Sequence, residues 1–193
     1  MRTASGRKKT KEPPANSSAS SFTKEIAESW QRELPDIDPT QLLAQIYIMR
    51  LGRVLDGAYD RLCREKAGMS GADMRVLFAL RRAGAPYIRR PTDLFRALLV
   101  TSGAITKQVD RLQDGGYVVR RPDPSFAGGF LIQLTGKGRA AAEQIVRTLA
   151  TRGLMAEATR VMSEGNLKEL KRLCETFLAA LETDRARPEK VRP

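Results

Sequence analysis

The sequence predicts a mainly α-helical fold with one small β-hairpin, and three patterns support this prediction. Long stretches towards both chain ends repeat apolar residues at three- and four-residue spacing, which is typical of amphipathic helices. Short helical segments follow one another between them. Two β-rich runs then flank a loop rich in proline and glycine, as in a hairpin. The order of these patterns predicts a central lobe flanked by long helices.

The predicted domain spans residues 25–184. Residues 1–24 combine Lys, Arg, Ser and Pro with few large apolar groups, so we expect a disordered basic arm, either DNA-attracting or merely a solvated leader. Residues 185–193 are expected to form a flexible tail for the same reason. Within the domain, residues 70–136 form the predicted central lobe, and residues 25–68 and 138–184 the flanking helices.

The flanking helices are expected to mediate dimerisation. Apolar spacing predicts helices from Thr40 to about Lys66, from Gly138 to about Met162, and from Asn166 to about Thr183. Apolar stripes at both ends of a small lobe favour packing of the ends together and against a second copy. The residues expected at that contact are Leu42, Ile46, Leu173, Phe177 and Leu181.

Capping signals place the elements of the central lobe. The run from Ser70 to Asp73 fits a capping box, and a helix through Leu80 follows. Pro91 suits the first position of a helix that extends to Leu99. Thr101 can cap a further helix that ends at Gly115 and Gly116 and buries Ile105, Val109 and Leu112. Strands are expected over residues 117–121 and 130–134.

The charge distribution points to a polyanionic partner. The formal net charge is +12, and residues 75–139 hold 12 basic side chains against four aspartates. A lobe with this excess of positive charge is expected to attract nucleic acid.

Catalysis is not expected. Histidine is absent, which removes the commonest general base and metal ligand, and neither metal-ligand spacing nor a glycine-rich phosphate loop occurs. Asp36 and Asp38 form a carboxylate pair, but they adjoin Pro35 and Pro39, where solvated turn residues are the ordinary interpretation. We therefore expect no cofactor, no metal and no enzymatic activity.

Neither a secretory signal nor an apolar run long enough to span a bilayer occurs, so we expect a cytoplasmic protein with no membrane partner. Cys63 and Cys174 lie in apolar-periodic stretches. We interpret both as small buried hydrophobic residues, with a redox-sensing thiol as the alternative.

Two successive short helices followed by a hairpin predict a winged helix-turn-helix lobe, in which the second helix enters the major groove of double-stranded DNA. Its outer face offers Thr106, Lys107, Gln108 and Arg111 to base edges, and its amino end offers Thr101, Ser102 and Gly103. Arg89, Arg90, Arg120 and Arg121 are expected to contact phosphate. The alternative is that Arg111 pairs with Asp110 or Asp114 and that Lys107 is simply solvated.

Three runs carry a family resemblance over about residues 30–183: residues 101–112, residues 116–121 and residues 134–138. Their sequences, TSGAITKQVDRL, GYVVRR and LTGKG, resemble those of the MarR family of regulators. The resemblance implies a homodimer held by its terminal helices, a pseudo-palindromic operator, and an effector bound between the dimerisation and DNA-binding lobes.

Trp30, residues 35–38 and residues 80–87 resemble the branch of the family that includes urate-responsive members. Arg75 stands where we align that branch's ligand-region aspartate, and Gln108 where we align a recognition-helix arginine. The wing reads Phe126-Ala127-Gly128 where the family usually reads Asp-Arg-Arg. Trp30, Arg50, Arg53 and Arg75 are the candidate effector residues, and they favour an anionic effector such as an aromatic carboxylate.

The sequence therefore favours a DNA-binding transcriptional regulator, specifically a repressor released by a small anionic effector. The alternative is an effector-independent dimer that coats DNA with weak specificity or acts as an adaptor.

Overall fold

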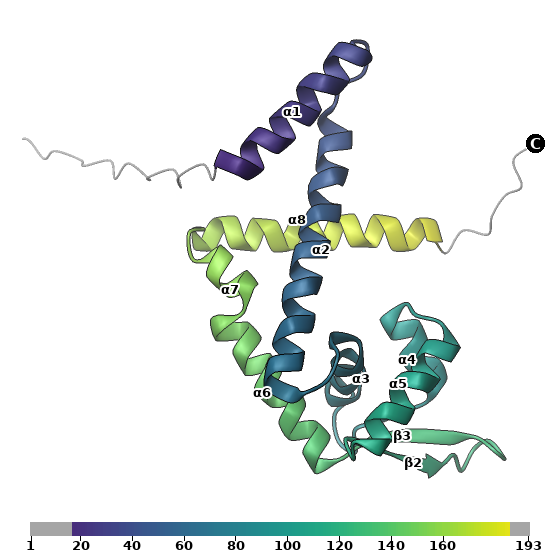
Figure 1. Ribbon diagram of the computed structural model, residues 1–193. Coiled ribbons are helices and arrows are strands. Elements are labelled where there is room, and N and C mark those ends of the chain that lie inside the picture. The colour runs from purple at the N-terminus through teal and green to yellow at the C-terminus, as the bar shows by residue number, and fades with distance from the viewer. Residues whose placement is uncertain (1–16, 186–193) are drawn as a thin grey trace, which may run out of the picture. The chain divides into compact units, whose positions relative to one another are not determined.

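The computed structural model describes residues 17–185, which are mainly helical and include one small antiparallel sheet (Figure 1). The predicted fold class is confirmed. The chain divides into two compact units, one formed by residues 51–158 and the other by the segments before and after it. Helix α2 (Thr40–Ala67) contributes to both units, whereas we assigned all of it to the flanking helices.

Residues 51–158 contain the predicted central lobe. Its helices are α3 (Gly71–Arg82), α4 (Pro91–Leu98), α5 (Ser102–Asp114), α6 (Gly136–Arg152) and α7 (Leu154–Thr159), of which the last extends one residue past the unit. Local signals start these helices, because the Ser70 hydroxyl accepts a hydrogen bond from the Asp73 amide at 3.1 Å and Pro91 occupies the first turn of α4. Leu99 ends α4 in the left-handed conformation at φ 55°.

The sheet has three strands in the order β1-β3-β2. Strands β2 (Val118–Pro122) and β3 (Phe130–Leu134) form the predicted hairpin, and the short strand β1 (Ile88–Arg89) adds to β3 on the other side, antiparallel like β2. The hairpin and the turn between its strands form the wing. Strand β1 was not predicted, since a two-residue strand leaves no alternation in the sequence.

A single apolar core holds these elements together. Helix α3 packs against α4, α5, α6 and β3, while α5 also packs against β2. The largest fully buried side chains of this core come from every one of these elements, and they include Leu77, Leu94, Ile105, Val118, Ile132 and Ile145. Because α5 and the wing share this core, their outward faces are held on one rigid support.

The other unit contains α1 (Ser17–Glu33), the start of α2, and α8 (Glu164–Arg185). Residues 17–24, which we assigned to the disordered arm, are helical, and residues 1–16 and 186–193 lie outside the described part of the chain. No helix within residues 17–185 combines the length and the apolar character that a membrane span requires.

Two sequence predictions about the carboxyl-terminal helices need correction. The predicted helix from Gly138 to Met162 is broken at Gly153, which has an extended backbone and separates α6 from α7. The carbonyl oxygen of Leu149 would lie 2.9 Å from a Cβ at this position, so the sharp turn suits glycine. Cys174 is exposed on α8, whereas Cys63 is buried as predicted.

Candidate nucleic-acid interface

Helix α5 is held by one apolar edge and leaves its opposite face open. The Thr101 hydroxyl accepts a hydrogen bond from the Ala104 amide at 3.2 Å and so begins the helix. Ile105, Val109 and Leu112 are buried in the core, as their spacing predicts. The arrangement fixes the rotation of α5 about its own axis, and therefore which side chains face solvent.

Five of the predicted DNA-contacting residues lie on the exposed side of α5 or at its start: Thr101, Ser102, Gly103, Thr106 and Lys107. The Thr106 hydroxyl donates to the Ser102 carbonyl at 3.1 Å, and the residue is exposed. Within the described residues, Lys107 forms no ion pair. Its ammonium group is therefore available to an external anion or base edge.

Gln108 does not belong to this exposed face. Its side chain is only 8% exposed, and its Oε1 atom has no hydrogen-bond partner among the described residues. The reason lies in helical geometry, because position 108 is three residues after Ile105 and four before Leu112, within the buried edge. Our assignment of Gln108 to base readout is therefore not supported by its position.

Arg111 is held by an ion pair rather than projecting freely. Its Nη2 atom lies 2.7 Å from Asp73 Oδ1, and its Nε atom lies 3.2 Å from Asp73 Oδ2. This hydrogen bonding raises the pKa of the Arg111 guanidinium. The alternative partners Asp110 and Asp114 were wrongly chosen, since the actual partner lies at the start of α3. Arg111 thus ties the carboxyl-terminal half of α5 to α3.

Asp73 was not predicted as a partner for the DNA-binding helix. The Ser70 hydroxyl donates to its Oδ2 atom at 2.7 Å, so the same carboxylate serves the helix cap and the ion pair. Only the capping pattern of residues 70–73 signalled this residue in the sequence.

The arginines around the hairpin differ in how firmly they are held. Arg120 contacts Asp110 at 2.5 Å and Gln113 at 2.8 Å, both on α5. Arg121 is exposed, and its Nε atom lies 3.1 Å from Gln133 Oε1 on β3. Arg89 is exposed on β1. Arg89 and Arg121 therefore keep outward positive charge on the sheet, while Arg120 braces α5 against the hairpin.

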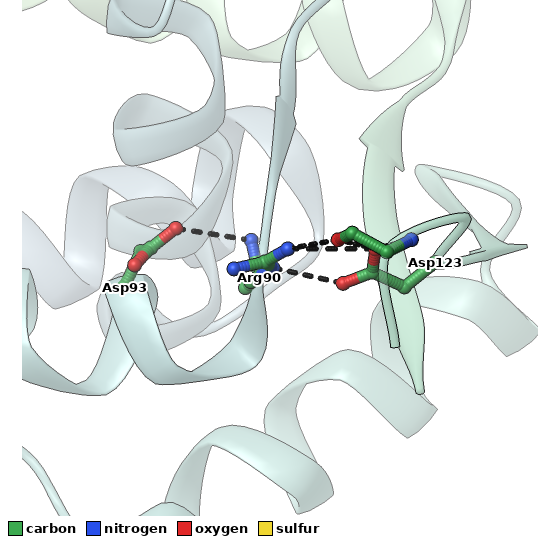
Figure 2. A network of polar contacts seen from close by, with 4 residues as sticks. Arg90, Asp93 and Asp123 are labelled. Carbon is green, nitrogen blue, oxygen red and sulfur yellow. Dashed lines mark hydrogen bonds and ion pairs between the residues drawn. The ribbon is translucent and has the colours of Figure 1, made fainter. Parts of the chain in front are cut away.

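Arg90 joins the amino end of α4 to the wing, as Figure 2 shows. Its Nε atom lies 2.8 Å from Asp123 Oδ2, and its backbone amide donates to the Asp93 carboxylate at 3.4 Å. Hydrogen bonds from the Ser125 hydroxyl and amide, together with Arg90, lower the pKa of Asp123 to about 2. Arg90 is thus committed to an internal contact, although half of its side chain remains exposed.

Two of the four candidate effector residues line one cavity. Arg53 on α2 and Arg75 on α3 border a space of about 340 Å³ together with Asp56 and Tyr59. Arg75 forms an ion pair with Asp56, and its guanidinium carbon lies 4.9 Å from the centre of the Tyr59 ring. Burial raises the pKa of Tyr59, so its phenol stays neutral. The cavity thus brings together two arginines, two aspartates (Asp56 and Asp60) and one aromatic ring.

Trp30 and Arg50 belong to the other unit. Trp30 lies on α1 with 43% of its surface exposed.

The residues predicted for dimerisation lie on α2 and α8. Leu173, Phe177 and Leu181 on α8 are between 46% and 51% exposed, and Leu42 and Ile46 on α2 are half-buried. Large apolar side chains aligned at helical spacing and left uncovered are typical of a protein-interaction surface.

Comparison with known proteins identifies the relatives of this chain. Residues 67–125 match the model of the MarR family. The chain is 31% identical to the HTH-type transcriptional regulator PecS of Dickeya dadantii over 63% of this chain and 73% of the relative. It is also 31% identical to the multiple antibiotic resistance protein MarR of Escherichia coli, covering 68% of this chain and 92% of the relative.

Solved structures of MarR-family proteins are also similar to this chain. A MarR mutant from Escherichia coli complexed with operator DNA superposes with a TM-score of 0.57 at 28% identity, covering 77% of this chain and 97% of that one. The regulator Sco5413 of Streptomyces coelicolor has a TM-score of 0.64 at 24% identity, with 76% and 98% covered, which supports the fold.

The short helices, the hairpin and the basic exposed face of α5 define a winged helix-turn-helix DNA-binding protein. The relatives are transcriptional regulators, and this chain is a DNA-binding regulator of the same kind. It belongs to the MarR family.

Proposed function

We propose that the protein is a repressor that binds a pseudo-palindromic operator as a homodimer and leaves it when a small anionic effector binds. The observation that carries the DNA-binding part is the exposed face of α5, where Lys107 has no ion-pair partner within residues 17–185 and Ser102, Gly103 and Thr106 leave room for close approach. A major groove accepts one α-helix, and a lysine on its outer face reaches guanine N7 and O6 or a phosphate.

The flanking basic residues support orientation rather than sequence reading. Arg89 on β1 and Arg121 on β2 are exposed and are suited to phosphate contacts, which fix the register of a protein on the duplex. Arg111 and Arg120 act indirectly in this proposal, because their ion pairs with Asp73 and Asp110 hold α5 in place.

Dimerisation follows from the apolar face of α8. Exposed leucines and a phenylalanine on one helix are costly in water, and a second copy offers the same surface for burial. A two-fold dimer presents α5 twice, so the operator is expected to contain two half-sites about one helical turn apart.

The proposed effector carries a carboxylate and an aromatic ring. The Arg75 guanidinium is already paired with Asp56 and stacked near Tyr59. An incoming carboxylate would compete with Asp56 for Arg75 and gain Arg53, which is exposed at the cavity edge. Such an exchange couples ligand binding to the ion pair between Asp56 on α2 and Arg75 on α3. Helix α3 also carries Asp73, which holds Arg111 on α5.

The DNA-binding part is tested by fluorescence anisotropy on the DNA beside the protein's own gene and on random duplex. We expect the own-gene DNA to bind at least about 10³-fold more tightly. If the dimer neutralises about six phosphates, the logarithm of affinity should fall against the logarithm of salt with a slope near −5. A preference below about tenfold would support the DNA-coating alternative instead.

The effector part is tested by thermal shift and DNA release with salicylate and benzoate as probes. We expect stabilisation of the wild-type protein and loss of the response in Arg53→Gln, with Arg61→Gln on the same helix as the matched control. If neither acid stabilises the protein or releases DNA, the proposed effector class is wrong.

A further inference from the structure

The wing turn lacks the positive charge that surrounds it. Between Arg121 and Lys137 the sequence contains neither lysine nor arginine. The Arg90 guanidinium, which contacts this turn, is bonded to Asp123 and to Ser125. If this turn contacts DNA, the contact therefore cannot depend on an unpaired lysine or arginine of the turn.

The turn is nevertheless built rigidly. The side chain of Asp123 is 5% exposed and accepts hydrogen bonds from the Ser125 amide at 2.9 Å and the Ser125 hydroxyl at 2.6 Å. The Asp123 amide donates to the Gly129 carbonyl at 3.0 Å, and the Gly129 amide donates to the Phe126 carbonyl at 2.9 Å. Gly128 supplies the left-handed conformation with φ 77°, which side chains rarely adopt.

This rigid turn presents one large apolar group. Phe126 is 68% exposed, although its ring lies so close to Gly129 that a Cβ there would approach Phe126 Cδ1 to 2.6 Å. Its ring also borders a groove of about 540 Å³ shared with Pro91 and Phe130. The side chain is thus oriented by its surroundings while most of its surface faces solvent.

We propose that Phe126 is the DNA-contacting residue of the wing and that it packs as an apolar wedge against the minor groove. This inference rests on the proposed entry of α5 into the major groove. Strand β2 packs against α5 and leads directly into the turn, so a duplex whose major groove holds α5 is expected to pass close to this turn.

The chemistry of the partner fits an apolar contact. Deoxyribose walls and the edges of base steps in the minor groove accept phenylalanine side chains, and partial unstacking is least costly at pyrimidine–purine steps. The wing of this chain is therefore expected to favour flexible steps flanking the major-groove half-sites, and its contribution to affinity is expected to be nearly independent of salt.

The test uses a duplex selected by the full-length wild-type protein from a random library. Affinity is measured at several salt concentrations for Phe126→Ala, Phe126→Leu and Phe126→Arg, with hydroxyl-radical footprints to report the minor groove. Val161→Ala is the matched control, because Val161 is 69% exposed and lies outside the DNA-binding unit.

We expect Phe126→Ala to weaken binding roughly tenfold with an unchanged salt slope, and Phe126→Leu to weaken it less. Phe126→Arg should steepen the slope by about 2, since each of two wings gains one phosphate contact. The footprint of Phe126→Ala should lose only the protections that flank the half-sites. Val161→Ala should bind as the wild type does.

Wild-type affinity and footprint in both Phe126→Ala and Phe126→Leu would overturn the inference. A changed oligomeric state with unchanged DNA affinity would also overturn it, because the turn would then be a protein contact. Lys107→Ala distinguishes a failure of the wing inference from a failure of the proposed role of α5. If it loses affinity while the Phe126 variants do not, only the wing inference fails, and if neither affects affinity, the proposed role of α5 fails as well.

Discussion

Replacing Arg111 with alanine removes one side of the ion pair between α5 and α3. The guanidinium donates to Asp73 at 2.7 and 3.2 Å. After the substitution, the Asp73 side chain, which is 7% exposed, retains the Ser70 hydroxyl and the hydrogen bonds of the helix cap. We therefore expect lower stability and a less firmly placed α5.

The magnitude follows from the burial of the two partners. Breaking a fully buried pair costs about 3–5 kcal/mol, and an exposed pair is worth about 0–1 kcal/mol. Because the Arg111 side chain is 56% exposed and screened by water while Asp73 is buried, we expect a loss of about 1–2 kcal/mol in the free energy of unfolding. For a chain of this length, that loss corresponds to a melting temperature about 2–8 °C lower.

The assay is a double-mutant cycle with Arg111→Ala, Asp73→Asn and the double variant, measured by thermal and urea unfolding at one protein concentration. Lys107→Ala is the control, since Lys107 forms no ion pair among the described residues, and its unfolding should change by less than about 0.5 kcal/mol. Unchanged stability of Arg111→Ala, together with a loss of DNA affinity as large as that of Lys107→Ala, would refute the reasoning. Arg111 would then read DNA directly.

Three further predictions concern the lobe, the wing and the dimer. Gly138→Ala should destabilise the protein by about 2 kcal/mol in urea unfolding, because the new Cβ meets the Tyr117 carbonyl oxygen, whereas Gly136→Ala, with open space around it, should not. The lowered pKa of Asp123 means that its carboxylate contributes stability above about pH 4 that is lost as the pH falls towards 2, so the difference in melting temperature between wild type and Asp123→Asn should shrink over that range. Phe177→Glu should raise the dimer dissociation constant at least about tenfold in sedimentation experiments, and an unchanged constant would exclude this face from the interface.

Local signals in the sequence were enough to predict most of the DNA-binding lobe. The caps at Ser70 and Thr101 and the proline at position 91 mark helix starts through contacts within a few residues, and α3, α4 and α5 begin where these signals lie. The start of α1 at Ser17 was missed, because its first turn is rich in serine and carries little apolar periodicity.

The sequence predicted the candidate site correctly only where helical geometry determines which side chains face solvent. The outward position of Lys107 follows from its placement opposite the buried edge, and the error at Gln108 came from neglecting its spacing to Ile105 and Leu112. The partner of Arg111 could not be predicted, since Asp73 is 38 residues away and meets it only through tertiary packing. Such long-range pairs leave no periodic signal in one sequence.

The measurement that tests the central claim most directly is dimethyl sulfate protection of guanine N7 on the DNA beside the protein's own gene. If two copies of α5 enter the major groove, the wild-type dimer should protect guanines in two patches about 10 base pairs apart, and Lys107→Ala should weaken both patches together. A single protected patch, or tight binding that leaves every guanine N7 reactive, would contradict this account.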